Sequence, residues 1–119
     1  MRRLILASVV VLIAIAVPGV ARADDRAKSK EQVEFGIRVA QNGLWNEALY
    51  WWQKAVKLDP TYAAAWNNLA IAYEHEGELA KARGAYEKAL ELEPGNALIK
   101  QNYELFREIN DRATRKDSQ

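Results

Sequence analysis

The amino-acid sequence predicts an all-α fold, a solenoid of short helical hairpins, on three observations. The pattern of apolar, small and turn-forming residues recurs after 34 positions, and a fixed period in this range is typical of stacked supersecondary units. Within each unit, apolar residues recur at three- and four-residue spacing, which is the period of one helical face. Glycine or proline stands where each such pattern stops, as expected at the end of a helix.

The composition narrows the class of protein before any motif is considered. The chain has 119 residues, no cysteine, one histidine and a formal net charge of +1, which fits one small domain. A balanced charge provides no broad basic surface for nucleic acid. Without cysteine there is no disulfide framework, thiolate nucleophile or cysteine-built zinc site. We expect a small binding module with no cofactor, no metal and no nucleic-acid partner.

Residues 1–23 have the three-part organisation of a secretory signal peptide. Arg2 and Arg3 precede an apolar stretch, residues 4–17, and a small-x-small cleavage site ends at Ala23. Those fourteen apolar residues are fewer than the roughly 20 that a membrane-spanning helix needs. We therefore expect cleavage after Ala23 and export to the periplasm or cell envelope. The open alternative is an uncleaved leader that anchors the chain in the inner membrane, the one case in which we expect a membrane contact.

The 34-residue period is visible in identical residues of two successive units, 29–62 and 63–96. The matching pairs are Ile37 and Ile71, Gly43 and Gly77, Ala48 and Ala82, Lys54 and Lys88, Ala55 and Ala89, Leu58 and Leu92, and Pro60 and Pro94. In each unit the glycine predicts the turn inside a hairpin, and the proline follows its second helix.

Small and bulky residues alternate in a way that predicts how each hairpin packs. In the second unit, Ala82 and Ala89 let two antiparallel helices approach closely, while Trp66 and Tyr86 fill the space beside them. The first unit follows the same plan. Its close-contact residues are Ala48 and Ala55, and its bulky residues are Trp45 and Trp52.

These residues resemble the tetratricopeptide repeat, or TPR, family. The second unit matches the family pattern at Trp66, Leu69, Ala70, Tyr73, Ala82, Tyr86 and Pro94. The first unit keeps Phe35, Gly36, Ala48, Trp52, Ala55 and Pro60. It departs from the pattern at Gln32, where Trp is usual, and at Val39, where Tyr is usual. The resemblance covers roughly residues 29–96.

A third unit begins after Asn96 and does not finish, which predicts a capping helix over residues 97–113. On a helical projection its apolar residues fall within an arc of about 160°. They are Leu98, Ile99, Tyr103, Leu105, Phe106 and Ile109. We expect this face to cover the apolar end of the stack. Residues 24–28 are expected to form a charged linker, and residues 114–119 a frayed polar tail.

The resemblance implies a curved stack whose first helices line an inner, concave surface that binds a peptide. The residues expected on that surface are Val33, Ile37, Gln41, Asn67, Asn68, Ile71, His75, Gln101, Asn102 and Leu105. An amide pair such as Asn68 with Asn102 can hydrogen-bond the backbone of an extended peptide, because each amide has donors and an acceptor. The alternative for these residues is packing between repeats, with the amides satisfied inside a helix–helix seam.

One known use of the family's concave surface is not expected here. Members that clamp a chaperone's C-terminal carboxylate carry Lys, Arg and Asn on this surface. Asn68 fits that pattern, but Val33 and Ile37 stand where Lys and Asn are expected. Leu98 and Asn102 likewise stand where Lys and Arg are expected. The chain therefore lacks the carboxylate clamp.

Tyr50, Trp51 and Trp52 are three consecutive aromatic residues, and neighbouring side chains on a helix diverge by about 100°. Trp52 is expected in the core, so Tyr50 or Trp51 is expected to be partly exposed as a possible outer-surface contact for another protein. The alternative is that the ring packs down over the next repeat. His75 stands alone among carboxylates, which is too few ligands for a metal site, and no catalytic motif is present.

The functional expectation is a non-catalytic interaction or scaffold module of the cell envelope that binds a peptide or helix of another protein. Two alternatives remain open: a membrane-anchored assembly factor that retains the N-terminal apolar helix, and a regulatory subunit of an envelope enzyme. Two repeats and a cap lie near the lower limit of stability for stacked units. Self-association, or constitutive binding of a partner, is therefore expected as an option.

Overall fold

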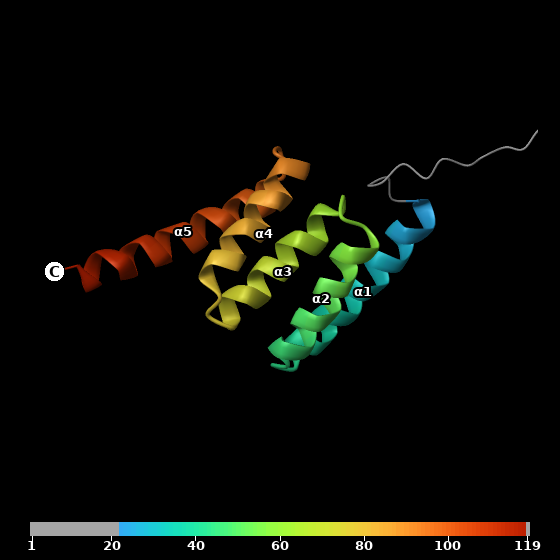
Figure 1. Cartoon of the computed structure of the whole chain (residues 1–119), viewed down its shortest axis with the longest axis horizontal. Helices are drawn as coiled ribbons and strands as arrows, with labels where there is room; N and C mark the ends of the chain where they lie inside the picture. Colours follow the sequence, from blue (N-terminus) through green and yellow to red (C-terminus); the bar gives the residue numbers. More distant parts are fainter. Residues whose placement is uncertain (1–21, 119) are drawn as a thin grey trace, which may run out of the picture.

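The computed structural model describes residues 22–118, and this part of the chain folds into five helices without strands. They are α1 (Ala23–Gln41), α2 (Trp45–Leu58), α3 (Ala63–His75), α4 (Leu79–Leu92) and α5 (Ala97–Asp117). Figure 1 shows the helices side by side in chain order, from α1 at one end of the stack to α5 at the other. The predicted all-α solenoid of two hairpins and a C-terminal helix is confirmed.

Both hairpins turn at a glycine in the left-handed region of backbone space. Gly43 and Gly77 have φ values of 78° and 73°, which a residue without a Cβ adopts at no steric cost. The same hydrogen bonds close the two turns. Leu44 donates to the carbonyl of Val39 at 3.1 Å, and Glu78 donates to that of Tyr73 at 2.9 Å. The sequence period is thus reproduced at the level of single backbone bonds.

The N-terminal boundary differs from the sequence expectation. The predicted leader lies outside the described residues except for Arg22 and Ala23, and α1 begins at Ala23. Residues 24–28, expected to be a linker, therefore form the first turns of a helix. Two long-range contacts hold them in place. Arg26 pairs with the buried carboxylate of Asp59, and Ser29 Oγ donates to the carbonyl of Ala55 at 2.9 Å.

The predicted close approach of the helices within each hairpin is confirmed. Ala48, Ala55, Ala82 and Ala89 are completely buried. The largest buried side chains beside them are Trp52, Tyr86 and Phe106.

Within residues 22–118, no helix is long and apolar enough to cross a membrane.

Helix α5 covers the end of the stack along a narrower stripe than expected. Ile99 and Phe106 are buried, and the Phe106 ring lies 5.4 Å from that of Tyr86. Leu98, Leu105 and Ile109 remain 62%, 56% and 57% exposed.

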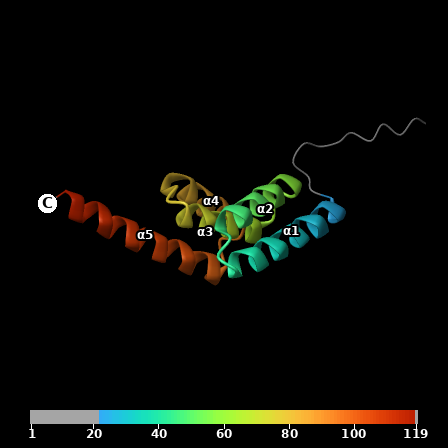
Figure 2. The same cartoon turned by 90° about the horizontal axis from the view of Figure 1, so that it is seen from below.

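Helix α5 is also longer than expected. It continues to Asp117, so residues 114–117 are helical where a frayed tail was expected. Figures 1 and 2 show its C-terminal part running out beyond α4.

Candidate functional site

An apolar groove lies between the first hairpin and α3. Its volume is about 300 Å³. The lining residues are Ile37, Ala40, Gln41, Trp45, Trp52, Asn68 and Ile71. Ile37 and Ile71 stand at equivalent positions of two successive first helices, so the 34-residue period places both on the same surface. In Figure 2, α1 and α5 lie on one side of the molecule, and α2 and α4 lie on the other.

Two indole rings, those of Trp45 and Trp52, line this groove. The rings of Trp45 and Trp52 have centroids 6.5 Å apart, at an angle of 57°. Trp52 is almost fully buried, and its Nε1 donates to the carbonyl of Val33 at 3.1 Å. That indole N–H is therefore already used. What Trp52 offers to a ligand is ring carbon, which suits an apolar side chain.

One end of the groove carries the single histidine. The imidazole of His75 stacks on Trp45 with ring centroids 3.5 Å apart and planes 8° from parallel. His75 is otherwise exposed. Within residues 22–118, no three His, Cys, Asp or Glu side chains gather to hold a metal ion. Stacking on Trp45 therefore positions the His75 imidazole at the edge of the apolar groove. Within residues 22–118, no group of metal-ligating side chains lies beside it.

The three predicted asparagines have different surroundings, and Asn102 follows the alternative of an amide satisfied between helices. Asn102 Nδ2 donates to Asn67 Oδ1 at 3.1 Å, and Asn67 is only 6% exposed. Asn68 donates to the carbonyl of Ala64 at 2.8 Å, within its own helix. Asn67 and Asn68 are consecutive, so they point about 100° apart, and only one of them can face α5. The Asn67–Asn102 hydrogen bond joins α3 to α5 and uses both amides inside that interface. Asn68 is the asparagine that lines the groove.

The structure brings together four of the ten predicted groove residues, Ile37, Gln41, Asn68 and Ile71, and places His75 at the end of the groove. Val33 is buried in the core, against the expectation of an accessible side chain. Gln101 and Leu105 are exposed on α5 and do not line this groove.

Sequence reasoning assigned Trp45 and Trp52 to the core alone and did not name Ala40. Ala40 follows Ile37 by three residues, so helical spacing from Ile37 gives the signal that finds it.

The predicted outer-surface residues lie on a different face. Tyr50 is 56% exposed. Trp51 is half-buried, with its ring 4.6 Å from that of Phe35 and at 69° to it. Trp51 therefore packs back onto α1 of its own repeat.

Two carboxylates near the hairpins are tied to specific partners. Burial raises the pKa of Asp59, but hydrogen bonds from Arg26 and Thr61 outweigh burial and hold this pKa below its ordinary value of 3.8. Burial raises the pKa of Tyr86, and a hydrogen bond from its hydroxyl to the Glu74 carboxylate raises it further. Both carboxylates are engaged in holding the fold together.

Comparisons with known proteins agree with this geometry. A family model described as TPR repeat matches residues 38–77, and one described as tetratricopeptide repeat matches residues 63–96. The second match coincides with the second unit delineated from the sequence.

Three curated relatives share a comparable segment. The chain is 32% identical over 77 residues to the Arabidopsis thaliana "Tetratricopeptide repeat domain-containing protein PYG7, chloroplastic", covering 65% of this chain and 26% of the relative. It is 35% identical over 66 residues to "Photosystem I assembly protein Ycf3" of Rippkaea orientalis, covering 56% of this chain and 38% of the relative. It is 36% identical over 67 residues to mouse "Protein O-mannosyl-transferase TMTC1", covering 56% of this chain and 7% of the relative.

The chain thus spans well under half the length of each of these relatives. What the comparisons share is the segment with the two hairpins. Repeats of this family generally serve as non-catalytic protein-interaction modules or assembly scaffolds. The repeat period, the hairpin geometry and both family-model matches agree that this chain belongs to the tetratricopeptide repeat family.

Proposed function

We propose that the chain is a non-catalytic binding module of the cell envelope that holds a segment of another protein in the groove between α1 and α3. The observation that carries this proposal is the apolar groove of about 300 Å³. A cleft with hydrophobic walls and few polar groups is the usual form of a site that takes up an apolar side chain. Gln41 and Asn68 at its edge supply amides for the backbone of the bound segment.

The role of such a binding event is the assembly of a larger complex. One relative carries "assembly protein" in its name, which favours a scaffold over a regulatory subunit of an enzyme. An envelope location follows from the leader-like residues 1–23. The variant of this proposal that keeps residues 4–17 as a membrane anchor predicts the same groove on a tethered protein.

The groove is tested by crosslinking in living cells from a photoreactive residue at Ile71. We expect one discrete protein to be attached there, and none from the matched position Glu91, which is exposed on α4. An Ile37→Glu substitution, which brings a charge into the groove, should abolish the adduct. Leu79→Glu makes the same change at another exposed aliphatic residue, outside this groove, and should preserve it.

Equal adducts from Ile71 and Glu91, or an adduct that survives Ile37→Glu in a protein that stays folded, would contradict the proposal. N-terminal sequencing of the protein recovered from the envelope distinguishes the two locations. A start at Asp24 supports the exported form, and an intact leader supports the anchored form.

A further inference from the structure

The first hairpin forms one end of the stack, and its side that faces away from α3 carries a regular pattern of charges and rings. Gln53 of α2 points toward α3, where its Nε2 donates to the Tyr73 hydroxyl at 3.4 Å. Trp51 precedes Gln53 by two residues, so its side chain points about 200° away around α2, toward the outside of the stack. Figure 1 shows this hairpin at the N-terminal end of the stack. We call this surface the end face, and its residues are Glu31, Phe35 and Arg38 of α1 and Glu47, Trp51 and Lys54 of α2.

The second repeat shows what the end face is in this fold. The equivalents of its three α1 residues, 34 positions further on, are all buried in α3: Ala65, Leu69 and Ala72. The end face is therefore the side on which a preceding repeat would stack. A terminal repeat needs a polar outer face, and four charged residues supply it. The Phe35 ring, which is 36% exposed, and the half-buried Trp51 are not needed for that purpose and leave apolar surface at the centre.

Both helices of the end face carry their residues in the same order: an acid, a ring four residues later and a base seven residues after the acid. Residues at these spacings lie along one side of a helix. The two helices of the hairpin run in opposite directions, and the Phe35 ring lies 4.6 Å from that of Trp51. The acid of each helix is therefore nearest to the base of the other. The two acids occupy one diagonal of the end face, the two bases occupy the other, and the rings lie between them.

The four charges of the end face form no ion pair within residues 22–118. The acid and the base of one helix are about 10 Å apart along its axis, which is too far for direct contact. By contrast, Lys81 and Lys88 of the second hairpin each pair with a nearby glutamate. Further along α1, Lys28 pairs with Asp24 at 3.4 Å. The end face thus keeps two acids and two bases that its own hairpin does not neutralise by ion pairing.

This diagonal pattern is complementary to a second copy of itself. Two such faces can meet about a two-fold axis that lies in the plane between them. With the axis across the helices, Glu31 of one copy lies opposite Arg38 of the other, and Glu47 lies opposite Lys54. With the axis along the helices, Glu31 lies opposite Lys54, and Arg38 lies opposite Glu47. In both arrangements every acid meets a base, and the rings of one copy meet the rings of the other.

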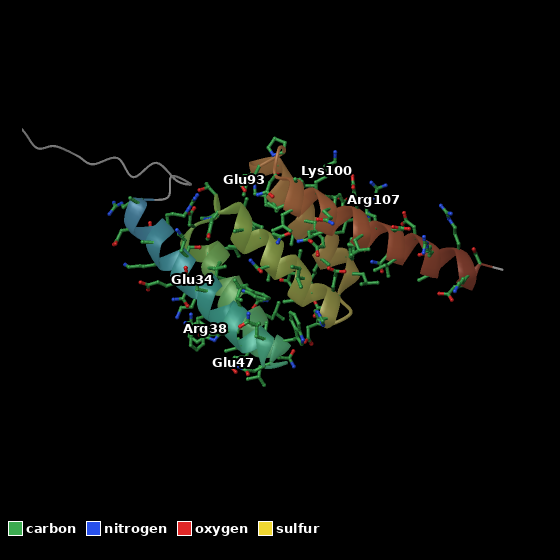
Figure 3. All side chains as sticks on the ribbon, turned by 180° about the vertical axis from the view of Figure 1, so that it is seen from behind. Glu34, Arg38, Glu47, Glu93, Lys100 and Arg107 are labelled. Carbon is green, nitrogen blue, oxygen red and sulfur yellow. The ribbon has the colours of Figure 1, made fainter. Side chains whose placement is uncertain are left out.

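Occupants of a single charge fit the end face less well. An acidic segment, a basic segment or an anionic bilayer would each meet both signs of charge there. Glu34 of α1 adds a third acid at the rim of the face. Figure 3 labels Glu34, Arg38 and Glu47 at the end of the molecule away from α5. The mixture of signs favours a partner with the same mixture, and a second copy of the chain has it.

We propose that the end face joins two copies of this chain in a symmetric dimer. The four rings form its apolar centre, and four acid–base pairs form its rim and set the register. Helix α2 has 14 residues and is about 21 Å long, so the contact lies at the low end of the areas buried by specific interfaces. We therefore expect the dimer to dissociate on dilution.

The dimer leaves the groove accessible. Ile37 points about 200° away from Phe35 around α1, so the groove and the end face lie on different sides of this helix. Each dimer has two grooves. Under the proposed function, it binds a partner that carries two copies of the recognised segment more tightly than a monomer does.

The test is sedimentation velocity of the purified full-length chain over a range of concentrations, with two charge-reversed variants. Arg38→Glu with Lys54→Glu makes all four charges of the end face negative, and Glu31→Lys with Glu47→Lys makes all four positive. We expect the wild type to pass from monomer to dimer as its concentration rises, and less so at high salt. Each variant alone should dimerise at least about tenfold more weakly, because like charges meet. An equimolar mixture of the two variants should restore the dimer.

The matched control combines Lys100→Glu with Arg115→Glu, two exposed residues of α5. It changes the net charge as much as the first variant does and should leave the dimer unchanged. A wild type that stays monomeric at every concentration would overturn the proposal, as would equal dimers in both charge-reversed variants. A mixture of the two variants that stays monomeric, although circular dichroism shows both to be folded, would overturn it too.

Two further outcomes would assign the contact elsewhere and overturn the proposal. Loss of the dimer in the α5 control would indicate head-to-tail stacking of the end face on α5. Loss of the dimer in Ile37→Glu would place the contact in the groove. We expect Ile37→Glu to dimerise like the wild type, so that a failure of the groove and a failure of the end face are observed separately.

Discussion

The two repeats solve the same packing problem with different side chains. The largest buried ring is Trp52 in the first repeat and Tyr86 in the second, at equivalent positions. Trp52 donates to a backbone carbonyl, that of Val33, at 3.1 Å. Tyr86 donates to a side chain, the carboxylate of Glu74. The wider indole fits because Gly36 faces it, where the second repeat has the fully buried Ala70.

The two repeats also differ in which helix of the hairpin carries a tryptophan at a second pair of equivalent positions. The first repeat has Gln32 on its first helix and Trp51 on its second, whereas the second repeat has Trp66 and Ala85 at the same positions. One large ring is present in each pair, on opposite members. The comparison teaches that equivalent positions of the two hairpins tolerate side chains of very different size, since Trp51 packs on Phe35 whereas Trp66 packs on the cluster of Ala63, Ala89 and Ile99.

The largest expected effect is that of Gly36→Ala. A Cβ at this position would lie 2.7 Å from Cδ1 and 2.8 Å from Cε2 of the buried Trp52. Because the indole is almost fully buried and its N–H is bonded to the Val33 carbonyl, we expect a loss of about 3 kcal/mol in the free energy of unfolding, at the upper end for overpacked cores. Chemical denaturation monitored by circular dichroism measures it.

Gly84→Ala is the matched control, since Gly84 is also inside a helix but faces open space. It should stabilise the protein by about 0.5–1 kcal/mol. In a Trp52→Tyr background, which makes the first repeat resemble the second, Gly36→Ala should lose most of its effect. Equal losses in both backgrounds would show that the glycine is not there to accommodate the indole.

The next effect concerns Asp59, a buried carboxylate with no buried counterpart in the second repeat, where Glu93 is exposed. Arg26 and Thr61 both donate to Asp59. Asp59→Asn removes the charge from these bonds and should lower the free energy of unfolding by about 2 kcal/mol. Glu93→Gln should change it by less than about 0.5 kcal/mol.

The Asp59 effect should depend on pH in a defined direction. The folded-state pKa lies below 3.8, so the folded protein holds its carboxylate ionised more strongly than the unfolded chain does. The stabilisation is complete above about pH 4 and is lost as the pH falls through the folded pKa. The wild-type and Asp59→Asn stabilities, measured by urea unfolding, should therefore converge on acidification. A difference that stays constant below pH 4 would contradict the linkage.

Tyr86→Phe should have a smaller effect, about 1–1.5 kcal/mol. The substitution removes the hydroxyl that donates to Glu74, a half-buried carboxylate. Tyr103→Phe is the control, because the Tyr103 hydroxyl donates to Glu87 at 2.8 Å in an exposed position, and it should change the stability by less than about 0.5 kcal/mol. Thermal unfolding of both variants decides whether burial of the acceptor makes the difference.

The smallest effect is expected for Tyr50→Ser. The side chain is 56% exposed, and glycine occupies the equivalent position of the second repeat. We expect a change in unfolding free energy of less than about 0.5 kcal/mol. A substantially larger loss in calorimetry would make Tyr50 part of the hairpin's packing and weaken the distinction between the two repeats.

Much of the fold follows from the sequence because its signals are local and repeated. The hairpin turns at Gly43 and Gly77, and the buried alanines between the helices, are visible in a single 34-residue period. The start of α1 was not predicted, because its first turns depend on Arg26 reaching Asp59, 33 residues away. A contact of that separation leaves no periodic trace in the sequence.

The candidate groove was predicted in part for a related reason. Ile37 and Ile71 follow from the period, but which of the predicted asparagines lines the groove and which lies between helices depends on the rotation of α3 against α5. Neighbouring residues on a helix point about 100° apart. A small error in the expected rotation of α3 therefore confuses a residue that lines the groove with one that packs between helices.

The clasp between Arg26 and Asp59 has a consequence for recognition. It ties the beginning of α1 to the connection between α2 and α3, and Thr61 in that connection also accepts a hydrogen bond from Arg26. The first turns of α1 are thereby held against the segment that leads into the second repeat. Under the proposed function, a groove whose walls are held in this way would lose little conformational entropy when a segment binds. Breaking the clasp should then weaken binding at the groove while the protein remains folded.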